Sequence, residues 1–173
     1  MYNQDRGLNM RLFLLIALIA ISPMAACMQP KDLYQRAVVS GGDGSFCVMA
    51  NDVPELKGKT ALVTNVSIYQ WVNGAQRAVW GQSYPPANGD VPRVSSTECM
   101  KGLGDRNNPL PSLLPGERYL VDVAAGIVDR DGDMVRRWYS GYFCVVSGGG
   151  GAEIRQVAFD QRRDVWRWDI CEP

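Results

Sequence analysis

Hydrophobic and polar residues alternate with a period of two along most of this chain. Between residues 117 and 127, for example, Tyr119, Val121 and Val123 share one face while Asp122 points to the other. Alternation of this kind predicts half-buried β-strands. The pattern places strands at residues 37–40, 45–51, 61–72, 76–82, 117–127, 134–146, 153–159 and 165–171.

Residues that favour turns separate the predicted strands. They supply the positive φ angles that tight turns require, and they occur at residues 41–44, at Asn73-Gly74, at Asp131-Gly132 and at residues 148–151. No segment combines the helical spacing of apolar residues with capping residues. Short strands joined by turns at this spacing predict an all-β fold, either an antiparallel sandwich or a barrel.

The segment from Leu114 to Tyr119 narrows this choice. Its sequence, LPGERY, resembles the corner before the sixth strand of immunoglobulin-like and fibronectin-like sandwiches, in which a tyrosine hydroxyl binds the preceding loop. The resemblance implies an immunoglobulin-like antiparallel β-sandwich. Alternatively, Tyr119 is simply an inward-facing aromatic residue at the start of a strand, which leaves the strand prediction unchanged.

The N-terminal segment predicts export. Residues 12–21, LFLLIALIAI, are uniformly apolar and follow Arg6 and Arg11, but the run is about half as long as the roughly 20 apolar residues of a membrane-spanning helix. We therefore predict a signal peptide at residues 1–26. Met10 is a more natural start for this peptide than Met1, because Arg11 follows it directly.

The end of the signal peptide, Met24-Ala25-Ala26-Cys27, resembles the lipobox of bacterial lipoproteins, although leucine usually occupies the position of Met24. The resemblance implies a diacylglycerol thioether and an amide-linked acyl chain such as palmitate on Cys27, which together hold a protein on a membrane stably. Residues 27–35 are then the lipidated cysteine and a tether, and residues 36–173 a single β-sandwich domain. The alternative is a conventional signal peptide cut after Ala25 or Ala26, with Cys27 a free thiol.

The residue after the lipobox indicates which membrane holds the lipoprotein. Met28 stands where lipoproteins retained in the inner membrane carry aspartate. By resemblance to that sorting rule, we expect a bacterial outer-membrane lipoprotein that is lipid-anchored and faces the periplasm.

The other cysteines agree with an exported chain. Cys47, Cys99, Cys144 and Cys171 are even in number, which predicts two disulfides in an oxidising compartment and leaves three pairings open. The chain has no C-x-x-C pair and no histidine, so we predict no metal site.

Charge and composition argue against several classes of function. The 18 basic and 18 acidic residues balance, which gives no basic stripe for nucleic acid. The absence of histidine excludes the usual serine and cysteine triads and most zinc sites, so we predict a protein that is not an enzyme and needs no cofactor. Residues 129–133, DRDGD, resemble the opening of a calcium loop, but the glycine comes two positions early and Ser140 replaces the glutamate, which favours a solvated hairpin turn.

The aromatic residues near the C-terminus are candidates for binding. Trp166 and Trp168 alternate with charged residues on the last predicted strand, and packing in the core is the default interpretation of such a stripe. The alternative is a protein-binding surface, because interfaces favour mixtures of aromatic residues and arginine. This surface would combine Trp166 and Trp168 with the residues Arg162, Arg163 and Arg167 and with the exposed faces of Trp71 or Trp80.

A family resemblance adds a function. The chain is similar to a family of small enterobacterial lipoproteins described as type VI secretion immunity proteins. The resemblance covers residues 27–159 and rests on Cys27, Val38-Val39, Phe46-Cys47-Val48, residues 63–71, Glu98-Cys99-Met100, Pro115-Gly116 and Tyr119-Leu120-Val121. It implies a protein that binds and neutralises a toxin acting in the periplasm. The alternative is a structural or assembly lipoprotein of the envelope whose domain binds other proteins, and an enzyme is a distant third.

The resemblance also implies a pairing of the cysteines. Cys47 and Cys99 match the family, so they pair with each other and leave Cys144 with Cys171. In a simple meander the strands of the second pair would lie about 9.6 Å apart, twice the strand spacing, whereas disulfides need Cα atoms within about 6.8 Å. We therefore expect the last strand to cross to the other sheet, or the meander to break near residues 148–151.

Overall fold

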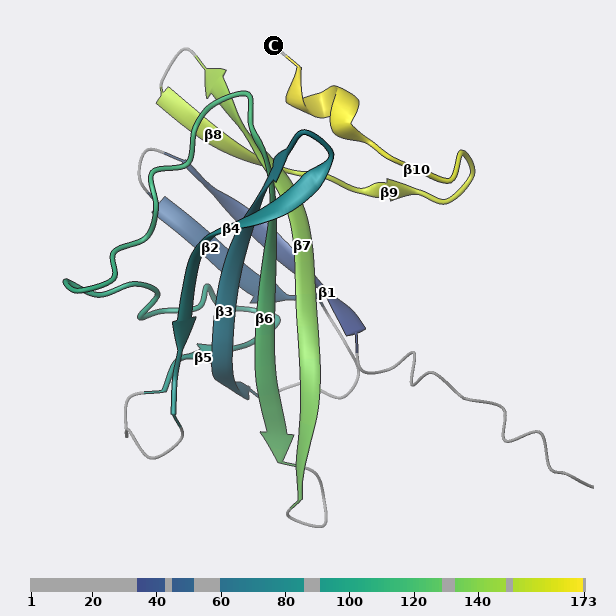
Figure 1. Cartoon of the computed structure of the whole chain (residues 1–173). Helices are drawn as coiled ribbons and strands as arrows, with labels where there is room; N and C mark the ends of the chain where they lie inside the picture. Colours follow the sequence, from purple (N-terminus) through teal and green to yellow (C-terminus); the bar gives the residue numbers. More distant parts are fainter. Residues whose placement is uncertain are drawn as a thin grey trace, which may run out of the picture. The chain divides into compact units, whose positions relative to one another are not determined.

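The strands of the computed structural model follow the period-two segments of the sequence (Figure 1). The structure describes residues 34–42, 45–51, 60–85, 91–128, 133–148 and 151–172, which all belong to one compact unit. The elements are β1 (Tyr34–Gly42), β2 (Ser45–Ala50), β3 (Ala61–Val72), β4 (Ala75–Ser83), β5 (Arg93–Val94), β6 (Arg118–Val128), β7 (Met134–Gly148), β8 (Gly151–Gln156), β9 (Phe159–Asp160), β10 (Val165–Trp166) and the 3₁₀ helix η3 (Trp168–Cys171). The predicted all-β class is confirmed.

Several predictions fall outside the described residues or need correction at their boundaries. The signal peptide, the lipobox with Cys27 and most of the tether lie outside the described residues, as do residues 129–132 of the acidic cluster. β1 begins at Tyr34, so Tyr34 and Gln35 belong to a strand and not to the tether.

The predicted strand at residues 165–171 is wrong beyond Trp166. Arg167 has φ −78° and ψ 61°, which ends the extended backbone, and Trp168–Cys171 forms η3. The strand predicted before it is also too long, because the chain leaves the main sheet after Gln156 and then forms a separate two-stranded sheet from β9 and β10. Of the two expected alternatives, the meander does not break near residues 148–151, since Gly148 still pairs with Gly151, and the final segment instead leaves the main sheet.

The described strands form an antiparallel β-sandwich that is continuous in its hydrogen bonding. The main sheet has eight strands: seven follow the order β2-β1-β8-β7-β6-β3-β4, and β5 pairs with β3. The exception to antiparallel pairing is the start of β1, where Tyr34, Gln35 and Arg36 run parallel to β7. β4, β3, β6 and β7 make one layer, and β1 and β2 cross behind it (Figure 1). The two layers are therefore joined where β1 and β8 pair with β7 and with each other.

A glycine allows β1 to cross β7. A Cβ atom on Gly141 would lie 2.6 Å from Cγ2 of Val39 and 3.2 Å from the carbonyl oxygen of Ala37. Any larger residue would push the two strands apart. The close approach of the two layers at this point therefore requires glycine.

A side-chain amide continues the pairing of β1 beyond its contact with β7. Nε2 of Gln156, at the end of β8, donates to the carbonyl oxygen of Ala37 at 2.7 Å. Oε1 of the same side chain accepts from the N–H of Val39 at 3.3 Å. Gln156 thus binds two alternate backbone groups of β1, as a neighbouring strand would.

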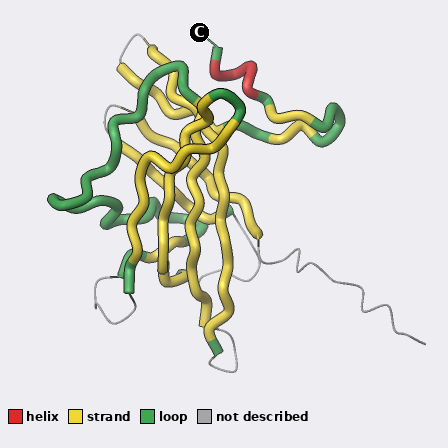
Figure 2. The backbone as a smooth tube through the Cα atoms, viewed as in Figure 1, coloured by secondary structure: helices red, strands yellow, loops and turns green. Residues whose placement is uncertain are grey.

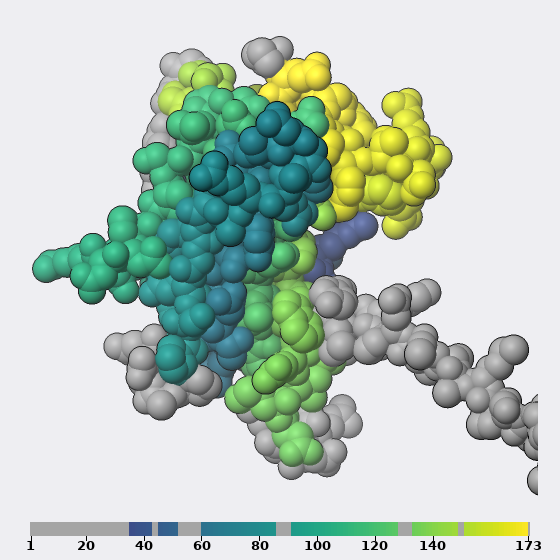
Figure 3. Space-filling view, in the orientation of Figure 1, coloured from purple at the N-terminus to yellow at the C-terminus, as the bar shows by residue number. Residues whose placement is uncertain are grey.

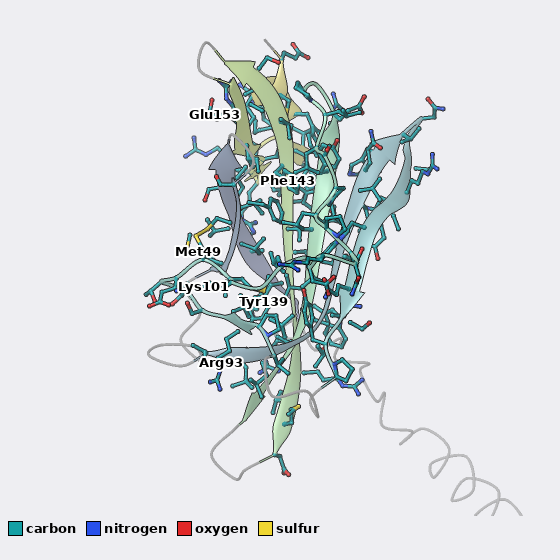
Figure 4. The ribbon with its side chains drawn as sticks, turned by 90° about the vertical axis from the view of Figure 1, so that its left-hand side faces the viewer. Met49, Arg93, Lys101, Tyr139, Phe143 and Glu153 are labelled. Carbon is teal, nitrogen blue, oxygen red and sulfur yellow. A yellow bond between two sulfur atoms is a disulfide. The ribbon has the colours of Figure 1, made fainter. Side chains whose placement is uncertain are left out.

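The main core lies between the two layers. Tyr139 and Phe143 of β7 point into it (Figure 4) and are fully buried. The ring of Phe143 lies 5.4 Å from that of Tyr119 and 5.6 Å from that of Phe46. The other strands contribute mainly β-branched residues, among them Val39, Val48, Val63, Val66, Ile68, Val121 and Val123.

The long connection from β5 to β6 covers part of each edge strand of the sheet (Figure 2). At the β2 edge, the N–H of Met100 donates to the carbonyl oxygen of Val48 at 2.9 Å, and a disulfide joins Cys47 to Cys99. At the β4 edge, Nδ2 of Asn108 donates to the carbonyl oxygen of Gly81 at 3.0 Å. These contacts occupy backbone groups that an edge strand would otherwise leave free.

A second, smaller cluster lies on the outer face of β7. The C-terminal segment, residues 157–172, turns back over this face, and its core consists of Cys144, Val146, Val157 and Cys171. A disulfide joins Cys144 to Cys171 with 5.8 Å between their Cα atoms. Both disulfides therefore have the pairing that the family resemblance implied. Cys171 lies in η3 and not in a further strand of the meander, and this brings it within bonding distance of Cys144.

Candidate functional site

Several half-buried aromatic rings surround a cavity of about 480 Å³ beside the C-terminal segment. We call it the aromatic pocket, and it is lined by Trp71, Asn73, Gly74, Gly116, Glu117, Arg118, Tyr142, Trp166 and Trp168. In Figure 3 the C-terminal segment (yellow) lies against the tip of the β3–β4 hairpin (dark teal). The site thus joins four separate parts of the sequence.

The β3–β4 hairpin supplies the first wall. Asn73 and Gly74 have φ angles of 52° and 80°, as the predicted two-residue turn requires. Trp71, just before this turn, pairs with Gln76 and faces outward. Its Nε1 is buried without a hydrogen-bond partner in the described part of the chain. The hairpin therefore brings to the pocket a tryptophan whose indole N–H has no hydrogen-bond acceptor within the described residues.

The loop before β6 supplies the second wall. The hydroxyl of Tyr119 accepts a hydrogen bond from the N–H of Leu114 at 2.9 Å, which is the contact of a tyrosine corner. Gly116, with φ 82°, donates its N–H to the carbonyl oxygen of Val145 at 2.8 Å. Because Tyr119 faces the core, the adjacent Arg118 faces outward into the pocket.

Tyr142 forms the floor of the aromatic pocket, and the C-terminal segment forms its third wall. The N–H of Val157 donates to the carbonyl oxygen of Tyr142 at 2.8 Å, which starts the segment along β7. The ring of Tyr142 lies 4.1 Å from that of Trp166 and 6.1 Å, edge to face, from that of Trp168. The disulfide of Cys171 holds η3, and with it Trp168, in this place.

The charged groups of the lining are one guanidinium and one carboxylate. The guanidinium of Arg118 lies over the ring of Trp168, 5.1 Å from its centroid, and it makes no ion pair with a described residue. Glu117 lies close enough to Tyr119 for its negative charge to help burial raise the pKa of that phenol. The pocket therefore presents hydrogen-bond donors and aromatic walls, a combination suited to binding.

A partly buried carboxylate lies on the same outer face. Asp122 of β6 accepts a hydrogen bond from the hydroxyl of Ser140 on β7. Burial raises the pKa of Asp122 above its usual value, and the bond from Ser140 opposes this rise. Burial also raises the pKa of Tyr142, and the negative charge of Asp122 adds to the effect.

The structure brings together only some of the predicted partner-binding residues. Trp166 and Trp168 line the pocket, whereas Arg162, Arg163 and Arg167 are exposed outside its lining. Arg167 forms an ion pair with Asp169 at 2.7 Å, and its hydrogen bonds lower the pKa of that carboxyl. The backbone N–H groups of Arg162 and Arg163 both donate to Asp160, which shapes the β9–β10 turn.

Of the alternatives Trp71 and Trp80, Trp71 lines the pocket and Trp80 does not. Trp80 is 7% exposed in the main core, and its Nε1 donates to the carbonyl oxygen of Asn108 at 3.4 Å. Tyr142 and Arg118 were not among the residues predicted to bind a partner. A signal was present in the alternation, because both residues neighbour inward-facing aromatic residues and so must point outward.

Two other cavities are less suited to specific recognition. One of about 320 Å³ lies at an end of the main core and has mostly apolar walls that include Phe46, Leu110 and Ile154. The other, of about 400 Å³, is a shallow hollow near Cys99. Neither combines aromatic rings with an unpaired charge.

Within the described residues, no group of cysteine, aspartate and glutamate side chains is arranged to hold a metal ion. No helix in the same part of the chain has the length and apolar character needed to cross a membrane. Comparisons with protein-family models, curated proteins and solved structures found no match for this chain.

Proposed function

We propose that this protein is an outer-membrane lipoprotein that faces the periplasm, where it binds and neutralises a toxin. The aromatic pocket is the observation that carries the proposal. It presents three tryptophans, a tyrosine and an arginine that no described residue pairs with, all on one face. Tryptophan, tyrosine and arginine are the residues that dominate binding energy in protein interfaces.

Two further observations support this location and role. The sequence Met24-Ala25-Ala26-Cys27 resembles a lipobox, and the two disulfides suit an oxidising compartment. The resemblance to type VI secretion immunity lipoproteins connects the compartment with a toxin as the partner. Neutralisation by binding needs no catalytic group in this chain.

The test is protection of cells that export the product of the adjacent gene to the periplasm. We expect the full-length lipoprotein to restore growth and to copurify with that product after detergent extraction. Trp168→Ala should weaken binding by about tenfold or more, because it removes an aromatic wall of the pocket. Val165→Ala is the matched control, since Val165 is exposed on the same segment and lies outside the lining. No protection and no copurification would reject the proposal, and capture of an envelope-assembly complex instead would favour a structural lipoprotein.

Lipidation has its own test. Cys27→Ser should abolish labelling by radioactive palmitate and leave an uncleaved or soluble precursor, because the thiol is the attachment point. Equal labelling of the two proteins would contradict the lipobox and with it the proposed outer-membrane location.

A further inference from the structure

The aromatic pocket holds a cation, Arg118, that forms no ion pair within the described part of the chain. Arg163 and Arg167, on the neighbouring segment, form ion pairs with Asp160 and Asp169. Arg118 forms none with a described residue, although it is the one arginine of the lining. A guanidinium has five N–H donors in a planar fork that matches a carboxylate. The guanidinium of Arg118 can therefore donate hydrogen bonds to a carboxylate that the partner supplies.

The arrangement of the rings argues against a cationic ligand. The position over the face of Trp168 is already occupied by the guanidinium of Arg118, at 5.1 Å from the ring centroid. Tyr142 is contacted by Trp166 and Trp168, and Trp166 also contacts Phe159 at 5.2 Å. An aromatic cage for a cation offers a free ring face. Here the face of Trp168 is occupied by Arg118, which would repel a cationic ligand.

We propose that Arg118 anchors a carboxylate on an acidic segment of the protein partner, and that an aromatic or aliphatic side chain beside this carboxylate packs against Tyr142 and Trp71. The inference rests on the proposed function, because it names the chemistry of the partner at the same site. The contact with Trp168 uses no hydrogen bond of the guanidinium and so leaves its N–H groups for a bidentate pair with a carboxylate. Closure of the pocket by the partner removes water and strengthens the pair.

Glu117 adds specificity to this pair. It is the one carboxylate of the lining and lies next to Arg118 in the chain. A partner segment with several adjacent acidic residues would bring a second negative charge towards Glu117. The pocket therefore selects a single acid next to an uncharged apolar residue, and not an acidic run.

Two short peptides test the inference directly. N-acetyl-Phe-Asp-amide carries the proposed combination, and N-acetyl-Phe-Asn-amide has the same shape without the charge. Each peptide is titrated into the full mature lipoprotein in detergent, with both disulfides formed, while the indole N–H signals of Trp166 and Trp168 are followed by NMR. We expect the aspartate peptide to shift these signals and to bind at least about fivefold more tightly than the asparagine peptide, with less preference at high salt.

Variants show whether the preference comes from Arg118. Arg118→Gln keeps much of the side-chain length but removes the charge, and it should bring both peptides to the weaker affinity. Arg118→Lys keeps the charge but loses the planar fork, so an intermediate preference is expected. Arg162→Gln is the control, because Arg162 is exposed outside the lining and forms no ion pair with a described residue.

The outcomes separate the inference from the proposed function. Equal affinity for the two peptides, no shift up to about 20 mM, or an undiminished preference in Arg118→Gln each overturns the inference. If the preference for aspartate holds but the exported toxin candidate neither copurifies nor is neutralised, only the proposed function fails. If the toxin candidate binds Arg118→Gln as tightly as the wild type, the proposed function stands and the inference fails.

Discussion

Strand β7 carries a hydrophobic cluster on each of its two faces, and the clusters are built in different ways. The inner one, around Tyr139 and Phe143, is covered by long strands that pair with one another across the sheet. The outer one, around Cys144 and Val146, is covered by a segment whose elements are two strands of two residues and a 3₁₀ helix of four. A disulfide joins this outer cover to β7.

This difference separates stability from recognition. Short elements bury little surface and pair few backbone groups, so they open more readily than a central sheet. One wall of the aromatic pocket, with Trp166 and Trp168, comes from this outer cover. The inner cluster therefore determines whether the domain folds, and the outer cluster determines whether the pocket exists.

The largest effect should come from the inner cluster. Phe143→Ala removes a fully buried ring between Tyr119 and Phe46, and we expect a loss of about 3–5 kcal/mol in the free energy of unfolding. Urea denaturation followed by circular dichroism measures it. The exposed Val165→Ala serves as control, with a change within about 0.5 kcal/mol. An average substitution costs about 1 kcal/mol. A loss no larger than about 1 kcal/mol for Phe143→Ala would therefore mean that the inner cluster does not dominate the free energy of unfolding.

The next effect concerns the outer cluster. Replacing both Cys144 and Cys171 by alanine removes a bond between residues 27 positions apart, worth up to roughly 3.6 kcal/mol by loop entropy. We expect local opening, so hydrogen exchange should accelerate at the amides of Val157 and Arg167 while Val121 and Val123 of β6 stay protected. Replacing Cys47 and Cys99 is the matched comparison. If the double variant exchanges uniformly across the sheet, the two clusters are one cooperative unit.

Gly141 tests the contact between the layers. Gly141→Ala places a methyl group 2.6 Å from Val39, and we expect overpacking to cost about 1–3 kcal/mol because valine has little freedom to move away. The thermal midpoint measures this cost. Gly74→Ala would instead cost mainly backbone strain, since no atom lies within 4 Å of its added Cβ. An unchanged midpoint for Gly141→Ala argues against the close crossing of β1 over β7.

The smallest effect is electrostatic and lies on the outer face. Because burial raises the pKa of Asp122, its charged form opposes folding above that pKa, and the penalty disappears as the pH falls towards the usual pKa of aspartate. Asp122→Asn should therefore stabilise the protein at pH 7 by on the order of 0.5 kcal/mol, with the gain shrinking near pH 4. Calorimetry at the two pH values measures it. Ser140→Ala should act in the opposite direction at pH 7, because it removes the hydrogen bond to the carboxylate.

Much of the fold could be predicted from the sequence because alternation and turn residues act locally. β3 spans the predicted residues 61–72, and the turn at Asn73-Gly74 has the expected positive φ angles. The C-terminal segment could not be predicted in the same way. Its alternation of exposed and half-buried residues continues through η3, so the pattern is the same for a strand and for a 3₁₀ turn held by a disulfide.

The site was predictable only in part, for a related reason. Trp166 and Trp168 were recognised as a stripe, but the choice between core and surface depends on what covers the outer face of β7. The partners of the stripe, Tyr142 and Arg118, come from other strands, and only the register of β6 against β7 brings them together. Arg162 and Arg163 lie outside the lining because the β9–β10 turn carries them away. Arg167, between the two tryptophans, lies outside it because it is exposed and pairs with Asp169.

The connection from β5 to β6 has a consequence for resistance to proteases. Its first part is tied to β2 by the Cys47–Cys99 bond, whereas its later part reaches the β4 edge through Asn108 and without a covalent link. A single cleavage between Cys99 and Asn108 would leave the first cover in place and release the second. The nicked chain would then present the β4 edge to other chains, and an uncovered edge strand is a template for self-association. Cleavage at one exposed loop would thus make the sheet prone to aggregate.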